Sequence, residues 1–333
     1  MGIALLYGCC QIETTARSLD ETRRFFIEAL GAGLIEQELA KQIDAIAPGT
    51  RYGCDHLGLG QAVFQVNQPD PEMVFNGHPS IHSAYLDRIG PCVTNLNFFV
   101  DDHAHARALL VGMGAPVHIE GPSTAARALS DYGPDNTRAG AAERPFLFLG
   151  TRSLIGLDLE IMEPNFLRFA DQSAQYPAFV QPRPAADDGN LLLRRLRVVV
   201  PDLTKTLSNL QEIFLPASRS KPYQHRAGAQ GRAFRLALGG IEIEYCQPLT
   251  SAGPLAEALE RHGPGVITIE FAARDLAAAR ARSRGMAEVS AEPDWLGLGG
   301  DRTPRHMIAS REAIGFDVVL EAADEPEYAR PVT

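Results

Sequence analysis

The feature that most constrains the fold of this chain is an alternating segment followed by a capped helix, which occurs four times. The first copy, QIETTARSLDETRRFFIEALG, begins at Gln11, and the others begin at Asn95, Arg195 and Thr268. Polar and apolar residues alternate at the start of each copy, which is the pattern of a strand with one buried face. The expected helix caps, each seven residues after the first strand residue, are Ser18, Asp102, Asp202 and Asp275.

A second alternating strand follows each copy, after a stretch rich in Gly, Pro and Asn. A unit of strand, helix and further strands therefore recurs every 75 to 100 residues, roughly, which is the size of a whole supersecondary module. The sequence thus predicts an α+β fold of four modules. The closing strands are expected in the segments GQAVFQVNQP, IGLDLEIMEP, GGIEIEYCQP and IGFDVVLEA.

One segment, residues 166–190, has few periodic apolar positions and several prolines, which is typical of a linker. It divides the chain into two halves of two modules each. The predicted domains are residues 1–165, with modules at about 5–72 and 90–165, and residues 191–325, with modules at about 191–250 and 262–323.

The composition favours a small-molecule substrate. A net charge of −10 argues against nucleic acid or an anionic membrane as the main partner, because both require a basic surface. No apolar run approaches the roughly 18 residues of a membrane span, and MGIALLYGCC lacks the basic start of a signal peptide, so we expect a cytoplasmic protein. A homodimer is compatible with these features. Five cysteines without CxxC spacing indicate neither a disulfide scaffold nor a zinc knuckle.

The repeated segments resemble the vicinal oxygen chelate superfamily, which includes glyoxalase I, methylmalonyl-CoA epimerase, bleomycin-resistance proteins and extradiol dioxygenases. The opening segment QIETTARSLDETRRFFIEALG, the closing strand GLDLEIMEP and the module entries YLDRIGPCVTNLNFFVDD and ALERHGPGVITIEFAARD carry this resemblance. It implies four βαβββ modules paired into two cup-shaped mixed-sheet domains. It also implies metal ligands on the first and last strands of each module. Those positions are Gln11, Gln65, Asn95 and Glu160 in the first cup, and Arg195, Glu244, Thr268 and Val319 in the second.

The residues of the first cup leave three alternatives open: a metal site, a metal-free catalytic pocket, and polar groups that merely line a wet concavity. The resemblance implies one divalent metal ion (zinc, nickel, manganese or iron) at the four positions, yet three amides and one carboxylate form a weak ligand set. Without a metal, Glu160 in a partly desolvated pocket is the expected general base, while the amides orient the substrate. Further candidate cup residues are Glu13, Asn97, Phe99 and Asp158 on the strands, and His56, His78 and His82 in the connecting segments.

The second cup has a different charge pattern. Arg195 and Arg197 lie on the same predicted strand face, opposite Glu242, Glu244 and Glu270, which predicts internal ion pairs. This half is therefore expected to be a structural or regulatory copy. The alternative is an arginine-lined cup that binds a substrate carboxylate in a bidentate manner.

Three functions remain in view, with an enzyme favoured. The leading hypothesis is isomerase or lyase chemistry by proton transfer on a small, hydrophobic or aromatic, oxygen-bearing substrate. The alternative is a non-catalytic protein that sequesters a ligand, as bleomycin-resistance proteins do. The third is an extradiol-type dioxygenase, although the two His and one Glu of that family are missing from the matching positions.

Overall fold

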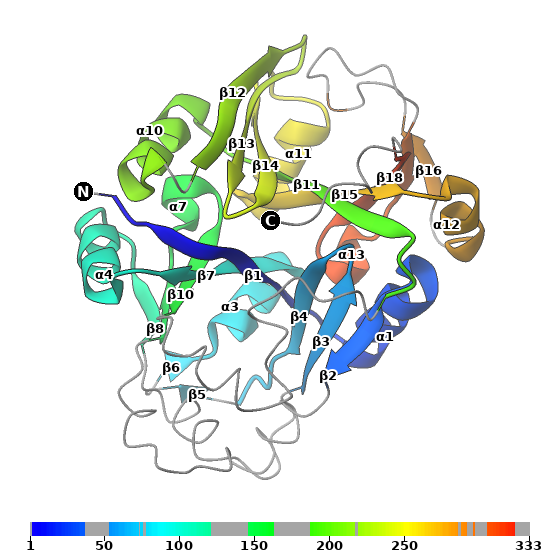
Figure 1. The fold of residues 1–333 in the computed structure, drawn as a ribbon, viewed down its shortest axis with the longest axis horizontal. Helices are drawn as coiled ribbons and strands as arrows, with labels where there is room; N and C mark the ends of the chain where they lie inside the picture. Colours follow the sequence, from blue (N-terminus) through cyan, green and yellow to red (C-terminus); the bar gives the residue numbers. More distant parts are fainter. Residues whose placement is uncertain are drawn as a thin grey trace.

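The structure is a computed structural model in which two mixed β-sheets pack together (Figure 1). Strands of the N-terminal half form the lower sheet in this view, and strands of the C-terminal half form the upper one. The residues that the structure describes are 2–36, 53–72, 74–75, 78–120, 146–162, 187–216, 219–285, 288–291, 296 and 305–323.

The first sheet joins two modules edge to edge. Its central strands run antiparallel to each other, and each runs parallel to the closing strand of its own module. In spatial order the eight strands are β2 (Gly33–Glu36), β3 (Gly53–Leu59), β4 (Ala62–Gln68), β1 (Leu5–Thr15), β7 (Cys92–Val100), β10 (Asp158–Met162), β9 (Phe146–Leu149) and β8 (Val117–Glu120).

The second sheet repeats this strand order and these strand directions. The predicted α+β fold of four modules, paired into two cup-shaped sheets, is confirmed. A short ribbon of β5 (Val74–Phe75) and β6 (His78–Pro79) lies outside both sheets. In spatial order the strands of the second sheet are β12 (Arg219–Ala227), β13 (Gly231–Leu238), β14 (Ile241–Pro248), β11 (Leu191–Val199), β15 (Gly265–Ala273), β18 (Asp317–Ala322), β17 (Arg305–Ile308) and β16 (Glu288–Ala291).

The helix that follows the first strand of each module begins at its predicted cap. The side chains of Ser18, Asp102, Asp202 and Asp275 each accept a hydrogen bond from a backbone N–H of the first turn. The first of these helices continues into a π-helical turn, η1 (Phe25–Ala29). The four helices are α1 (Leu19–Arg24), α4 (His103–Gly112), α10 (Leu203–Ile213) and α12 (Leu276–Arg282).

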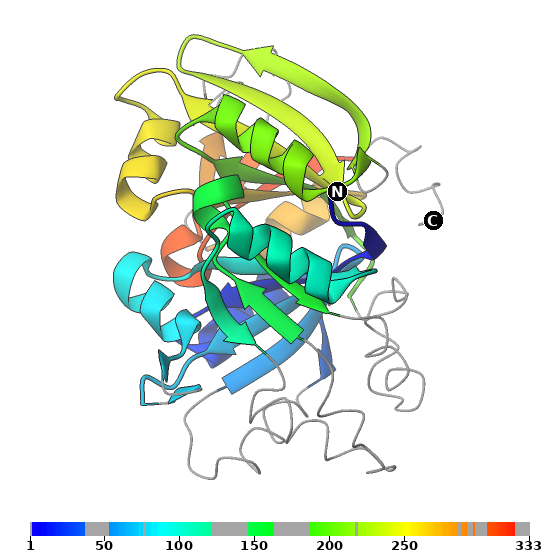
Figure 2. The same ribbon diagram turned by 90° about the vertical axis from the view of Figure 1, so that its left-hand side faces the viewer.

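Two further pairs of helices occupy matching places in the two halves. One pair precedes the second module of each half, and the other, a single turn long, precedes the closing strand. The pairs are α3 (Ile81–Ile89) with α11 (Pro254–His262), and α7 (Arg152–Ile155) with α13 (Arg311–Ile314). In Figure 2, α4 and α10 lie on the same side of the molecule. Asn209 of α10 donates a 2.8 Å hydrogen bond to the carbonyl of Leu154, which lies in α7.

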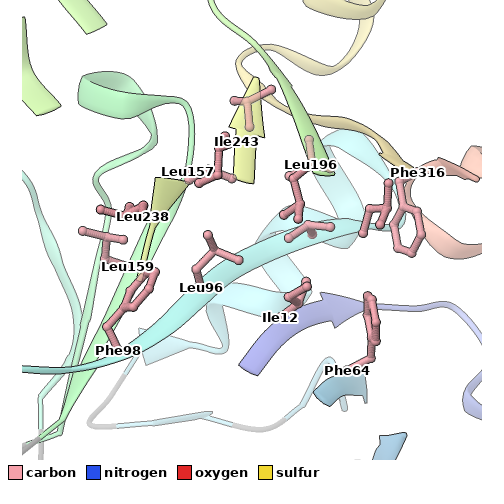
Figure 3. Close-up of a cluster of buried hydrophobic side chains, with 14 of the residues drawn as sticks. Ile12, Phe64, Leu96, Phe98, Leu157, Leu159, Leu196, Leu238, Ile243 and Phe316 are labelled. Atoms are coloured by element: carbon pink, nitrogen blue, oxygen red, sulfur yellow. The ribbon is translucent and has the colours of Figure 1, made fainter. Parts of the chain in front are cut away.

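The hydrophobic core lies between the two sheets (Figure 3). Ile12 and Leu96 of the first sheet and Leu196 and Ile243 of the second belong to one cluster of fully buried side chains. Successive residues of a strand point to opposite faces. Because Ile12 faces the core, its neighbours on β1 face the other side of the first sheet, and the same holds along each central strand.

The two halves also exchange matching backbone hydrogen bonds. The carbonyl of Gly60, in the β3–β4 turn, accepts a 2.9 Å bond from the Leu193 N–H of the second half. Reciprocally, Gly239 in the β13–β14 turn accepts a 2.7 Å bond from the Cys9 N–H of the first half. The halves are therefore related by an approximate twofold arrangement.

Most of the predicted linker, through residue 186, and the long segment 121–145 lie outside the described residues. None of the helices in the described part has the length and apolarity to cross a membrane.

Candidate active site

Polar side chains gather on the face of the first sheet that points away from the core. On this face Gln11 of β1 lies opposite Asn97 of β7, which in turn lies opposite Glu160 of β10. Residues paired directly across neighbouring strands point to the same side. Gln11 and Glu160 therefore share one face and are separated by a single strand.

The next row of the same face is centred on Glu13. It lies opposite both Gln65 of β4 and Asn95 of β7. The four positions that the resemblance marks as ligands are thus divided between two adjacent rows, Gln11 with Glu160 and Gln65 with Asn95. We call this polar face the first cup.

Glu13 is the best-connected side chain of the first cup. The amide nitrogens of Gln65, Asn67 and Asn95 donate hydrogen bonds to its carboxylate, Gln65 at 2.9 Å. His82 Nε2 lies 3.3 Å from the same oxygen, Oε1, that Gln65 contacts. The carboxylate, which is buried, therefore meets three amide N–H groups and the His82 ring in place of water.

A second set of contacts links Gln11 to β3. Asn97 donates to Gln11 Oε1, and Gln11 Nε2 lies 3.0 Å from His56 Nε2. His56 Nε2 also lies 3.1 Å from Gln65 Oε1. In a neutral imidazole one nitrogen either donates or accepts, so only one of the two His56 contacts is a hydrogen bond at a time. Burial lowers the pKa of His56 to about 4, although the Gln65 hydrogen bond opposes this shift.

Glu160 differs from Glu13 in its surroundings. Its side chain is only 8% exposed. Burial raises the pKa of Glu160 well above the usual range, the negative charge of Glu13 raises it further, and the hydrogen bond with Asn97 opposes both effects. Two carboxylates on one face thus have different environments, one surrounded by donors and one whose burial disfavours the charged form.

Asp158, predicted to bind substrate, is held by structural contacts. It accepts hydrogen bonds from Tyr85 Oη and, at 2.8 Å, from the Arg152 backbone N–H. The Arg152 guanidinium stacks 4.5 Å from the centroid of the Tyr85 ring and donates to the Val93 carbonyl. These contacts anchor α3 and α7 to the sheet.

The same anchor recurs in the second half and has a sequence signal that the repeat analysis missed. The Asp317 carboxylate accepts from the Arg311 backbone N–H at 3.1 Å, and Arg311 donates to the Ile267 carbonyl. The segments TRSLIGLD and SREAIGFD share the pattern of a hydroxyl residue, Arg, two residues, Ile, Gly, one residue and Asp. This repeated pattern identifies Arg152 and Asp158 as a structural pair.

Helix α3 brings a histidine into the first cup. His82, its second residue, is buried and contacts Glu13. The His82 ring packs edge-on against Phe148, with centroids 6.0 Å apart, and Phe148 lies directly opposite Glu160. Sequence reasoning named His82 but missed Phe148. The side chain of His78, another candidate, lies outside the described part of the structure.

Phe99 continues the apolar part of the cup. It lies two residues beyond Asn97 on β7, hence on the same face, and it is fully buried.

The second cup, the corresponding face of the second sheet, is filled by ion pairs. Arg197 contacts Glu244 at 2.6 Å and Glu270 at 3.0 Å, while Arg195 contacts Glu270 at 3.0 Å and Glu242 at 2.5 Å. The predicted internal ion pairs are confirmed. A substrate carboxylate would have to displace these glutamates, at the cost of leaving a buried charge without its partner.

The other two predicted positions of the second cup add no metal ligand. Thr268 lies opposite Arg197, and Val319 lies opposite Glu270 with a fully buried apolar side chain.

The donor set of the first cup does not fit a catalytic divalent metal ion. Among the described residues, no cluster of three or more His, Cys, Asp or Glu side chains is placed to hold one. Gln65 and Asn95 direct amide nitrogens, which cannot coordinate, towards Glu13, and the Gln11 oxygen accepts from Asn97. The amides are thus hydrogen-bonded to each other and to one carboxylate.

Two solved structures share the overall fold of this chain. A variant of 4-hydroxymandelate synthase from Streptomyces coelicolor matches with a TM-score of 0.59 and 17% identity, over 96% of this chain and 94% of that chain. A xylose isomerase-like TIM barrel/4-hydroxyphenylpyruvate dioxygenase fusion protein matches with a TM-score of 0.54 and 14% identity, over 97% of this chain and 50% of that chain. No protein-family model matches the sequence, and neither does any curated protein.

Over nearly its whole length the chain therefore shares the fold of these two structures. At such low identities the likeness is one of fold, and activity has to be argued from the site.

Proposed function

We propose that the chain is an enzyme that catalyses isomerase or lyase chemistry by proton transfer on a small oxygen-bearing substrate bound in the first cup. The observation that carries this proposal is the environment of Glu160. It is a buried acid whose pKa is raised first by desolvation and then by the neighbouring Glu13 charge. General acids and bases with a pKa moved towards the working pH are the most effective proton carriers.

The surroundings of Glu160 suit a substrate with both polar and apolar parts. Asn97 positions the carboxyl group, and Gln11 lies beside Asn97 on the same face. Phe148 is opposite Glu160, and Phe99 is on the same face of the adjacent strand. Protonated Glu160 would donate to a substrate oxygen, and its carboxylate would take a proton back later in the cycle. The apolar rings favour a hydrophobic or aromatic substrate skeleton.

The test is Glu160→Gln, which keeps the shape and removes the titrating group. With α-hydroxy ketones as probes in D2O, we expect the parent to exchange the C–H proton beside the carbonyl. The variant should lose this exchange by about 100-fold or more, which is the usual contribution of a general acid or base. ¹H NMR measures the exchange. Glu260→Gln on the exposed side of α11 is the matched control and should exchange like the parent. Exchange that persists in Glu160→Gln would refute the proposal.

A ligand-sequestering protein is the second candidate, and the interlocked amides of the first cup favour it. Glu13 accepts hydrogen bonds from the side-chain amides of Gln65, Asn67 and Asn95, which gives a preorganised polar wall. Tight binding of a probe without exchange or turnover in the parent would support this function.

The dioxygenase hypothesis rests on neighbours whose likeness shows only the fold, and it needs a redox metal that the donor set of the described first cup does not fit. We expect metal analysis of the purified chain to find far less than one equivalent of iron. Stoichiometric iron would instead revive that hypothesis.

A further inference from the structure

We propose that His82 is a second acid–base group of the first cup, held in one tautomer by Glu13, and that its Nδ1 removes a carbon-bound proton from the substrate. This inference rests on the proposed proton-transfer function and adds to it the group that acts on carbon.

The contacts of Glu13 determine where the His82 proton lies. A carboxylate that already accepts from three amide N–H groups acts here as an acceptor, so the His82 Nε2 atom at 3.3 Å carries a proton. In the neutral ring the Nδ1 atom then holds the lone pair. A carboxylate that orients a histidine in this way is the arrangement found in hydrolytic triads.

The His82 Nδ1 atom has no hydrogen-bond partner within the described part of the chain, and the residue is only 6% exposed. A buried acceptor without a partner is disfavoured unless a water or a ligand meets it. The Nδ1 atom of His82, which would act as the base, is therefore not used by any of the described side chains.

His82 and Glu160 both lie next to Phe148. His82 packs on the Phe148 ring, and Phe148 lies opposite Glu160 in the sheet, so the two groups are neighbours of one phenyl ring. Other titratable groups around His82 are Glu13 on β1 and His118 on β8, whose ring also packs on Phe148 at 5.6 Å. Burial lowers the pKa of His118, which favours the neutral form of that ring.

Two such groups suit an α-hydroxy ketone or aldehyde. His82 Nδ1 takes the proton of the carbinol carbon, the released electron pair forms a C=C bond, and Glu160 gives its proton to the carbonyl oxygen. The enediol then loses its other hydroxyl proton to the Glu160 carboxylate, while the His82 imidazolium returns its proton to the former carbonyl carbon. Both groups end in their starting states, and no electrons are gained or lost.

The first experiment needs no substrate. ¹⁵N–¹H correlation spectra of the histidine rings should show His82 in the Nε2–H tautomer, and Glu13→Gln should abolish this preference. A parent His82 that carries its proton on Nδ1 would overturn the inference.

The second experiment follows C–H exchange of 2-hydroxyacetophenone in D2O. His82→Gln should slow exchange by about 100-fold or more while the affinity for the probe, measured by NMR titration, stays within a few-fold. His105→Gln, on the core-packed helix α4, is the matched control and should exchange like the parent.

The variants separate the two proposals. Exchange retained in His82→Gln but lost in Glu160→Gln would overturn the role of His82 and leave the proposed function standing. Exchange retained in Glu160→Gln but lost in His82→Gln would overturn the role of Glu160 and leave that of His82 standing. A parent that exchanges no probe would overturn both.

Discussion

At the scale of single residues, the two carboxylates of the first cup show how neighbours determine chemistry. Glu13 and Glu160 come from similar alternating strands and share one face of the sheet. Glu13 meets three amides and a histidine, whereas burial and the nearby charge of Glu13 raise the pKa of Glu160. Strand alternation predicts the shared face, but the number of donors around each carboxylate depends on residues from three other elements, β4, β7 and α3.

His56 gives a prediction at this scale. Its folded-state pKa, about 4, is below the usual 6.5, so the unfolded chain binds more protons between these values. The contribution of this group to stability is complete above pH 6.5 and is lost as the pH falls towards 4. The loss should reach about 3 kcal/mol, at 1.36 kcal/mol per pKa unit.

His56→Gln cannot titrate, so the difference in unfolding free energy between parent and variant should shrink as the pH falls from 6.5 to 4. Urea denaturation at a series of pH values measures it. A difference that does not change with pH would contradict the buried neutral imidazole.

At the scale of elements, the helix starts are local properties. The four predicted caps are all in place, because a side chain that accepts from an N–H three residues later needs no distant contact. The π-helical turn η1 after α1 was not predicted. Its Phe25 and Phe26 rings are buried, and Phe26 packs on Phe64 of β4, so tertiary contacts accompany this irregular turn.

The cap of α10 gives a prediction at this scale. Asp202 accepts hydrogen bonds from the N–H groups of Thr204 and Lys205, each at 3.0 Å. Asp202→Ala should therefore lower the free energy of unfolding by about 1 kcal/mol. Asp202→Asn retains an accepting oxygen and should lose much less. Chemical denaturation of the two variants measures this, and equal losses would show that capping is not the cause.

At the scale of the whole molecule, the two halves contact each other closely at two matching glycines. Gly156 and Gly315 end the single-turn helices α7 and α13 with positive φ angles of 74° and 93°. A Cβ on Gly156 would lie 2.7 Å from Val198 of the other half, and a Cβ on Gly315 would lie 2.4 Å from the Cys92 backbone. Each glycine is thus both a helix end and a contact between the halves.

Gly315→Ala should consequently destabilise the whole molecule. The left-handed backbone costs about 1 kcal/mol for alanine, and the contact with a rigid backbone adds to it, for a total on the order of 3 kcal/mol. Gly114→Ala is the matched control, because Gly114 has the same φ of 93° with nothing within 4 Å of the added Cβ. Thermal unfolding of both variants measures the difference. Similar losses would show that the contact between halves contributes little.

The sequence by itself determined the repeating unit, the helix starts, the strand faces and the ion pairs of the second cup, because each depends on a period of a few residues that every copy repeats. Only the tertiary structure decided that Asp158 accepts hydrogen bonds from Tyr85 and Arg152, and that helix α3 brings His82 to Glu13. The charge state of Glu160 also depends on burial by the assembled sheet. These features arise where elements far apart in the chain meet, and no local pattern records such a meeting.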